Sequence, residues 1–165
     1  MARSLGETTI TVSVLDRLID LEPNNRMENS LSRSQSVRLL KNAVRRDLEW
    51  LLNSRRPPWE PAPAAKELWR SVYCYGLPDT TSLAMTSDED RNRMVRMVAS
   101  AVAAFEPRLM NVRVNMEPAS STSRVLHFQI EALLRMEPSP ARVFFDTTLE
   151  LANGEYAVAG DDRAR

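Results

Sequence analysis

Apolar side chains recur at three- and four-residue steps through the first two thirds of the chain, a pattern typical of amphipathic helices. It predicts a short helix within residues 10–20, a long one at about 35–54 and a third at 88–105. The long helix has one continuous apolar stripe, formed by Val37, Leu40, Val44, Leu48 and Leu51. Pro107 follows the third helix and ends it, because proline disfavours helical geometry in the residue before it.

The spacing changes to two in the last third, as expected for strands with one buried face. Alternating runs occupy 112–116, 126–134 and 143–151, and Asn153–Gly154 predicts a tight turn into a short return strand. Helices followed by strands predict an α+β fold. In it, N-terminal helices pack on one face of a small, largely antiparallel C-terminal sheet.

A single domain fits the length of 165 residues, which is enough to bury a core. We expect it at 10–158, between a flexible N-terminus at 1–9 and a flexible C-terminal tail at 159–165. Within it, four prolines in residues 57–63 favour an extended path after the long helix.

Composition narrows the function classes. Basic and acidic side chains are balanced at 22 each, so no overall field attracts nucleic acid or anionic lipid. The single Cys74 excludes an internal disulfide and a cysteine-based zinc site, and the single His127 excludes a multi-histidine metal site. No apolar run approaches the roughly 20 residues that cross a bilayer. These features predict a cytoplasmic protein without a metal, another cofactor or membrane insertion.

The long helix has two further surface features. Leu39 and Trp50 lie about three turns apart, on the side away from the apolar stripe. Either this helix is enclosed within its own domain, or Leu39 and Trp50 form a patch for a partner. Residues 33–56 also hold seven basic residues against two acidic ones, a net charge of +5. That face is either solvated or suited to an acidic partner.

Glu106, Pro107 and Arg108 form a rigid corner between the third helix and the first strand. Proline fixes its own φ and favours an extended Glu106, so the Glu106 and Arg108 side chains are expected to project on the same side. The glutamate offers hydrogen-bond acceptors and the arginine a forked donor. Such a pair suits the capture of a partner's polar groups. The alternatives are an internal salt bridge and a general acid for catalysis.

The sequence contains no specific catalytic motif. It lacks a glycine-rich phosphate loop and a visible Ser–His–Asp arrangement. His127 lies on the polar side of a strand, and Cys74 is expected to be buried rather than nucleophilic. Glycoside hydrolysis needs two carboxylates beside one sugar bond, and among 22 acidic residues a pair is not diagnostic. We therefore assign no catalytic residue.

Four segments, RRDLEWLLNSRR, SVYCYGLPD, FEPRLMNVRV and FDTTLELANGEY, occur in this order. Together they resemble the baseplate wedge family of contractile injection machines, and most of all its members in bacterial type VI secretion systems. The resemblance spans roughly residues 10–158. It implies a structural subunit that sits on a wedge of TssF and TssG, at the inner face of the inner membrane, and joins it to the first layer of the TssB and TssC sheath. A peptidoglycan-cleaving muramidase is the alternative, because a similar phage subunit is labelled lysozyme-like.

The resemblance also implies that the Glu-Pro-Arg corner contacts the helical core bundle of the wedge. The residues assigned to partner binding are Glu106, Pro107, Arg108, Trp50, Leu39 and Arg46. For the sheath, we expect the 143–151 strand to be a sheet edge that another chain's strand extends, because unpaired backbone groups accept a further strand. The residues assigned to this edge are Val143, Phe145, Asp146, Thr148 and Glu150, with Val143 and Phe145 facing the core.

Overall fold

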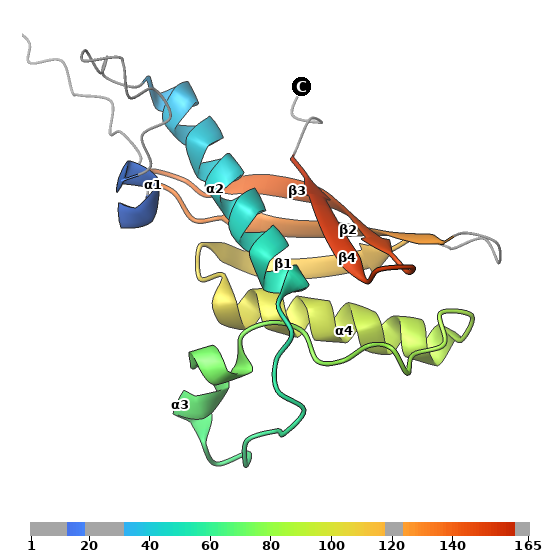
Figure 1. Ribbon diagram of the computed structural model, residues 1–165. Helices are drawn as coiled ribbons and strands as arrows, with labels where there is room; N and C mark the ends of the chain where they lie inside the picture. The colour runs from blue at the N-terminus through green and yellow to red at the C-terminus, as the bar shows by residue number, and fades with distance from the viewer. Residues whose placement is uncertain (1–12, 19–31, 118–123, 161–165) are drawn as a thin grey trace, which may run out of the picture.

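The computed structural model describes residues 13–18, 32–117 and 124–160 (Figure 1). Its helices are α1 (Val14–Leu18), α2 (Arg33–Asn53), α3 (Lys66–Trp69) and α4 (Asp88–Phe105), with a 3-10 turn, η1, at Val72–Cys74. Its strands are β1 (Leu109–Met116), β2 (Val125–Leu134), β3 (Ala141–Glu150) and β4 (Glu155–Ala159). Helices followed by an antiparallel sheet confirm the predicted α+β class.

The predicted flexible ends are only partly covered by the structure. The N-terminus at 1–9 lies outside the described residues, as do residues 161–165 of the predicted tail. Ala159, the first residue of that tail, is instead the last residue of β4. The extent of the single domain stays a prediction.

Helix α2 begins at a capping box that apolar spacing does not reveal. The Ser32 hydroxyl accepts a hydrogen bond from the Gln35 backbone N–H, and the Gln35 side chain accepts one from the Ser32 N–H. This reciprocal pair satisfies donors at the helix end, so α2 begins at Arg33, two residues before the predicted start. The helix ends at Asn53, ahead of the proline-rich segment.

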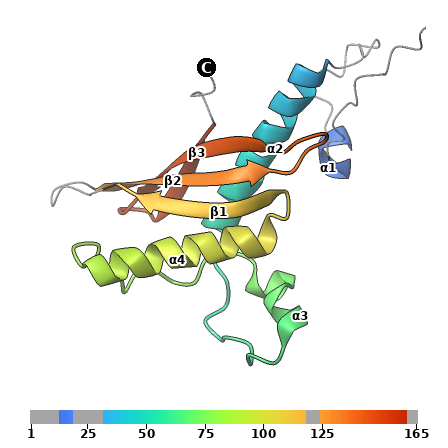
Figure 2. The ribbon, with the colours of Figure 1, turned by 180° about the vertical axis from the view of Figure 1, so that it is seen from behind.

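The four strands form one antiparallel sheet in the order β1–β2–β3–β4. Helix α2 crosses one face of this sheet, and α4 runs beside β1 (Figures 1 and 2). The buried side chains of both helices belong to one hydrophobic core with strand residues that include Val114, Phe128, Ile130, Leu134, Val143, Phe145, Leu149, Tyr156 and Val158. The core therefore lies between the two long helices and one face of the sheet.

The prediction that the 143–151 strand is a sheet edge is wrong over most of its length. β3 pairs with β2 throughout, and its other side pairs with β4 from Asp146 to Glu150. Asp146, Thr148 and Glu150 therefore have strand neighbours on both sides. Alternation identified the strand and its buried face but could not give its position in the sheet, because that position depends on which strand pairs beside it.

The other two residues of the assigned edge, Val143 and Phe145, lie in the part of β3 that precedes its pairing with β4. Val143 and Phe145 are buried in the core, as predicted. They belong to the segment 141–145, which has no strand partner on the β4 side among the described residues. Any free edge of β3 is limited to this segment.

The outer edge of β4 is closed by side chains of α2. The Asn53 carboxamide donates to the Tyr156 carbonyl and accepts from the Tyr156 backbone N–H, both at 2.8 Å. Arg45 donates to the Val158 carbonyl at 3.1 Å. Because these bonds occupy backbone groups that an added strand would use, β4 is a poor template for strand addition.

Residues 54–77, which we call the excursion, form a loop after α2 whose two ends meet at a narrow neck (Figure 1). Arg55 and Leu77 form a parallel bridge, and the Leu77 N–H donates to the Ser54 carbonyl at 2.9 Å. Gly76 lies in the neck with a φ of 101°, and a Cβ added there would stand 2.3 Å from the Ser54 carbonyl oxygen. The neck therefore requires glycine at this position.

Gly76→Ala is expected to lower the free energy of unfolding by about 2–3 kcal/mol, because alanine is strained at positive φ and its methyl group meets fixed backbone. Urea denaturation measures the loss. Gly160→Ala is the matched control, since an added Cβ there lies 3.7 Å from its nearest neighbour, the Arg45 Cδ. Equal stability of the two variants would contradict this account of the neck.

Candidate functional site

The Glu-Pro-Arg corner joins the end of α4 to the start of β1. Glu106 is the C-cap residue of α4, with φ −117° and ψ 80°, and its N–H donates to the Val102 carbonyl at 2.9 Å. The Glu106 and Arg108 side chains lie side by side, as expected from extended geometry, and they bind each other. Arg108 Nε lies 2.6 Å from Glu106 Oε1, and a terminal guanidinium nitrogen of Arg108 contacts the other carboxylate oxygen.

Glu106 is not presented to solvent. It is only 4% exposed, and its carboxylate also accepts a hydrogen bond from the Arg108 backbone N–H at 3.2 Å. Of the alternatives for this corner, the internal salt bridge is therefore present, and the Glu106 carboxylate is not accessible for capture of a partner's polar groups. Pro107 is exposed and Arg108 is partly exposed, so these two residues form the outer surface of the corner.

The salt bridge continues into a chain of alternating charges. Arg108 reaches across to Asp47 of α2 at 2.5 Å, and Asp47 pairs with the neighbouring Arg46 at 2.8 Å. Arg46 pairs in turn with Asp16 of α1 at 2.8 Å. We call Glu106, Arg108, Asp47, Arg46 and Asp16 the charged chain. It connects α1, α2 and the junction of α4 with β1.

Pairing within the charged chain shifts the pKa of its members. Hydrogen bonds to Glu106 and Asp47 raise the pKa of Arg108 against the effect of burial. Burial alone would lower the pKa of Arg46, but hydrogen bonds to Asp47 and Asp16 outweigh it and raise the pKa. Burial works against the charged form of Asp16, yet hydrogen bonds from Ser13 and Arg46 leave its pKa below the usual value. The Asp16 contribution to stability is thus complete at neutral pH and is lost only as the pH falls through that lowered pKa.

An exposed stripe runs along α2 beside the charged chain. Trp50 is 52% exposed and Leu39 is 38% exposed, so the alternative in which α2 is enclosed on all sides is wrong. Arg46 lies between them, four residues before Trp50, and its guanidinium sits 4.9 Å from the centroid of the Trp50 ring. We call Leu39, Arg46 and Trp50 the outer stripe. It combines apolar area with a cation on a rigid helix.

Two members of the charged chain, Asp47 and Asp16, are not among the residues predicted to form the site. Asp47 is one of only two acidic residues in the basic segment 33–56, and its position beside Arg46 could have indicated a role in ion pairing. Asp16 offered no comparable signal, because its pairing with α2 follows from the tertiary fold. The structure thus brings four of the six residues assigned to partner binding into contact: Glu106 with Arg108, and Arg46 with Trp50.

Other candidate chemistry is limited. Cys74 is buried, as predicted, and His127 is exposed on β2. Within the described residues, no group of three or more His, Cys, Asp or Glu side chains is placed to hold a metal ion. None of the helices in the described part of the chain is both long enough and apolar enough to span a bilayer.

Comparison with known families identifies the class of protein. The family model described as baseplate wedge protein gp25 matches residues 38–139, more than half of the chain. The match includes most of α2 and the whole Glu-Pro-Arg corner, and it indicates a structural component of a baseplate. The chain belongs to the baseplate wedge protein gp25 family, which is the family of TssE, and this confirms the family resemblance. Of the four segments that carried it, the first three lie within the matched residues and FDTTLELANGEY follows them. A search of curated proteins finds no match.

Proposed function

We propose that this chain is the TssE-type subunit of a type VI secretion baseplate. It links the TssF and TssG wedge to the first layer of the TssB and TssC sheath, in the cytoplasm at the inner face of the inner membrane. One observation is central to the proposal: the residues matched by the family model contain both halves of the Arg108–Asp47 salt bridge. The same segment contains the outer stripe of α2.

The wedge-facing surface consists of the outer stripe together with Arg108 and Pro107. Tryptophan and arginine are the residues that most often dominate binding energy at interfaces. Here Trp50 and Arg46 are already stacked, and Arg108 is held by Asp47 and Glu106. Side chains fixed before binding lose less conformational entropy when a partner docks. Glu106 therefore supports the interface from within, by orienting Arg108 rather than by touching the partner.

The sheath-facing surface is restricted by the sheet topology. β4 covers β3 from Asp146 onward, and Asn53 and Arg45 close the outer edge of β4. The segment 141–145 is the part of the assigned strand that has a free side among the described residues. We assign the sheath contact to this segment, where a partner strand would add next to β4.

A muramidase is the second candidate, and the geometry disfavours it. The acid at the corner, Glu106, is buried and bound to Arg108 through both carboxylate oxygens. A glycosidase needs a carboxylic acid that reaches the leaving oxygen of an accessible sugar bond. Glu106 does not meet this requirement, so we assign no catalytic role to it.

Deletion of the gene from a bacterium with this secretion system is expected to abolish assembly of fluorescently labelled sheath, and the wild-type chain is expected to restore it. The reason is that the first sheath layer would have no attachment to the wedge. Time-lapse microscopy of sheath assembly and extension provides the measurement. Normal sheath assembly in the deletion strain, with peptidoglycan clearing by the purified chain, would overturn the proposal in favour of the muramidase.

A further inference from the structure

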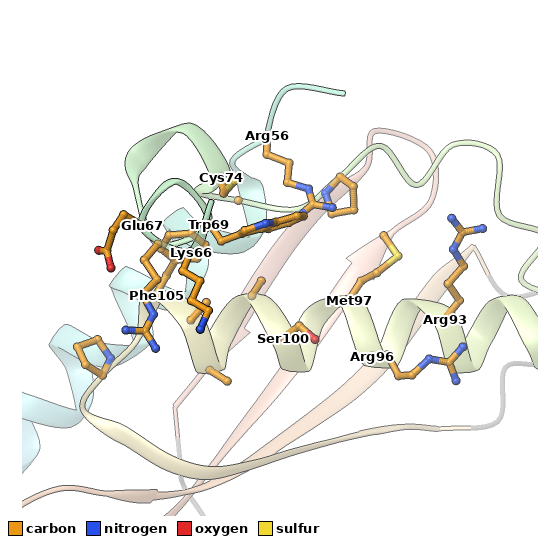
Figure 3. Close-up of a pocket in the computed structure, with 17 residues that line it drawn as sticks. Arg56, Lys66, Glu67, Trp69, Cys74, Arg93, Arg96, Met97, Ser100 and Phe105 are labelled. Atoms are coloured by element: carbon orange, nitrogen blue, oxygen red, sulfur yellow. The ribbon is translucent and has the colours of Figure 1, made fainter. Parts of the chain in front are cut away.

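A groove of about 1040 Å³ lies between α4 and the excursion and includes Pro107 of the corner, but no residue of the outer stripe or of the segment 141–145 lines it. Arg93 and Arg96 of α4 stand on one side of it, and Arg56, Lys66 and Arg70 line it from the excursion. Figure 3 shows the two sides facing across the groove, with Trp69 over α4. We call this feature the basic groove.

The floor of the basic groove is apolar and helical. Met97, Ser100 and Ala104 follow Arg93 at steps of four, three and four, so they lie on one face of α4. Phe105 continues the apolar floor at the end of the helix. From Arg93 to Ala104 this face is about 16 Å long at 1.5 Å per residue, a length that matches about three turns of another helix.

The charge of the basic groove is largely unneutralised. Five cationic side chains line it against one carboxylate, Glu67, and one of the five, Arg56, is paired with Glu60 at 3.0 Å. Among the described residues, no carboxylate forms a salt bridge with Arg93, Arg96, Lys66 or Arg70. The whole chain has a formal net charge of zero, so this concentration of cations is a local feature and not a consequence of composition.

Contacts within the excursion fix the side of the basic groove that lies opposite α4. Its neck at Gly76 fixes both ends, and the four prolines of residues 57–63 stiffen the segment that leads to α3. The Trp69 indole N–H donates to the Ala62 carbonyl at 3.2 Å, and the Arg56 guanidinium lies 5.8 Å from the centroid of the Trp69 ring. This side is therefore ordered before any partner arrives.

We propose that the basic groove docks an acidic amphipathic helix of a partner protein. The apolar floor receives the apolar stripe of that helix, and the arginines on both sides pair with its carboxylates. The basic groove contains no residue of the outer stripe and meets the wedge-facing surface only at Pro107, so the docked helix would lie beside the wedge contact. Nucleic acid is a poorer fit, because single strands are bound by aromatic faces that stack with bases, and the Trp69 ring is already engaged by Arg56.

The test uses fluorescence anisotropy with a labelled 18-residue helical peptide that has leucines along one face and glutamates on the rest. Two further probes are the same peptide with lysine for every glutamate, and a labelled 18-nucleotide single-stranded DNA. We expect the acidic peptide to bind the full-length chain at least tenfold more tightly than either of the others. Equal or tighter binding of the lysine peptide or of the DNA would overturn the proposal, as would the absence of binding by the acidic peptide.

Substitutions inside and outside the basic groove test whether the acidic peptide binds there. Arg93→Glu with Arg96→Glu is expected to weaken acidic-peptide binding at least tenfold, whereas Arg124→Glu with Arg135→Glu, an equal charge change at exposed positions outside the groove, should preserve most of the affinity. Ser100→Trp fills the floor without changing charge and should also weaken binding at least tenfold. Circular dichroism and urea denaturation verify that each variant is folded. Equal losses in the two double variants, or full affinity in Ser100→Trp, would contradict the assignment to the groove.

Discussion

Glu106→Ala is expected to lower the free energy of unfolding by about 3 kcal/mol, as is usual when one partner of a buried ion pair is removed. Glu106 is 4% exposed and accepts three hydrogen bonds from Arg108. Its loss would leave the Arg108 guanidinium with only Asp47, which is not enough to satisfy its donors in a partly buried site. Urea denaturation monitored by circular dichroism measures the effect.

Glu131→Ala is the matched control for this variant. Glu131 also forms a salt bridge with an arginine, but the Arg142 side chain is 63% exposed, so the pair is expected to contribute less than about 1 kcal/mol. A loss in Glu106→Ala as small as the loss in Glu131→Ala would show that burial of the corner does not stabilise the fold.

The double variant Arg46→Glu with Trp50→Ala is expected to weaken wedge binding by at least 100-fold. Removing a central tryptophan or arginine from an interface commonly costs about 2 kcal/mol or more, and here the two side chains are stacked on each other. Arg46→Glu also replaces a cation with an anion between Asp16 and Asp47. Biolayer interferometry against the immobilised TssF–TssG wedge measures the affinity.

Two controls separate binding from folding in that experiment. Trp50→Ala alone should bind about 30-fold more weakly, the equivalent of about 2 kcal/mol, yet unfold at nearly the same urea concentration because its side chain is half exposed. Trp59→Ala removes a tryptophan that is 78% exposed on the excursion and should bind the wedge normally. Equal affinity losses in Trp50→Ala and Trp59→Ala would contradict the assignment of the outer stripe.

Secondary structure was largely predictable because burial of one face imposes a period on each element. Helix α4 occupies the predicted range 88–105, and β2 begins one residue before the predicted 126–134. Most of the predicted α2 stripe and of the β3 alternation faces the core, as expected, whereas Leu151, at the end of the predicted strand, lies beyond β3 and is 43% exposed. These features depend on local spacing, which the sequence displays directly.

Long-range pairing was not predictable in the same way. The alternation in β3 is the same whether or not β4 returns beside it, but the turn predicted at Asn153–Gly154 implies a return strand there, so the edge assignment disagreed with a local signal as well as with the observed pairing. Arg108 and Asp47 are 61 positions apart, and only the tertiary fold brings them together. For the same reason, extended geometry correctly placed Glu106 beside Arg108 but gave no indication that Glu106 would be buried.

The basic groove illustrates the same limit for surfaces. In the sequence, Arg93 and Arg96 look like ordinary charged residues of a solvated helix, and the proline-rich segment does not by itself indicate a binding site. The neck at Gly76 places α3 opposite α4 and turns these separate features into one concave surface. Its charge becomes evident only when residues from both segments are considered together.

The central claim is that this chain binds a baseplate wedge through the outer stripe and the Arg108 corner. Size-exclusion chromatography of the purified chain mixed with the TssF–TssG wedge of its own system, at micromolar concentration, tests it most directly. We expect the wild-type chain to elute with the wedge, whereas the folded Arg46→Glu, Trp50→Ala double variant should elute separately. Separate elution of the wild-type chain, or elution of the double variant with the wedge, would contradict the central claim.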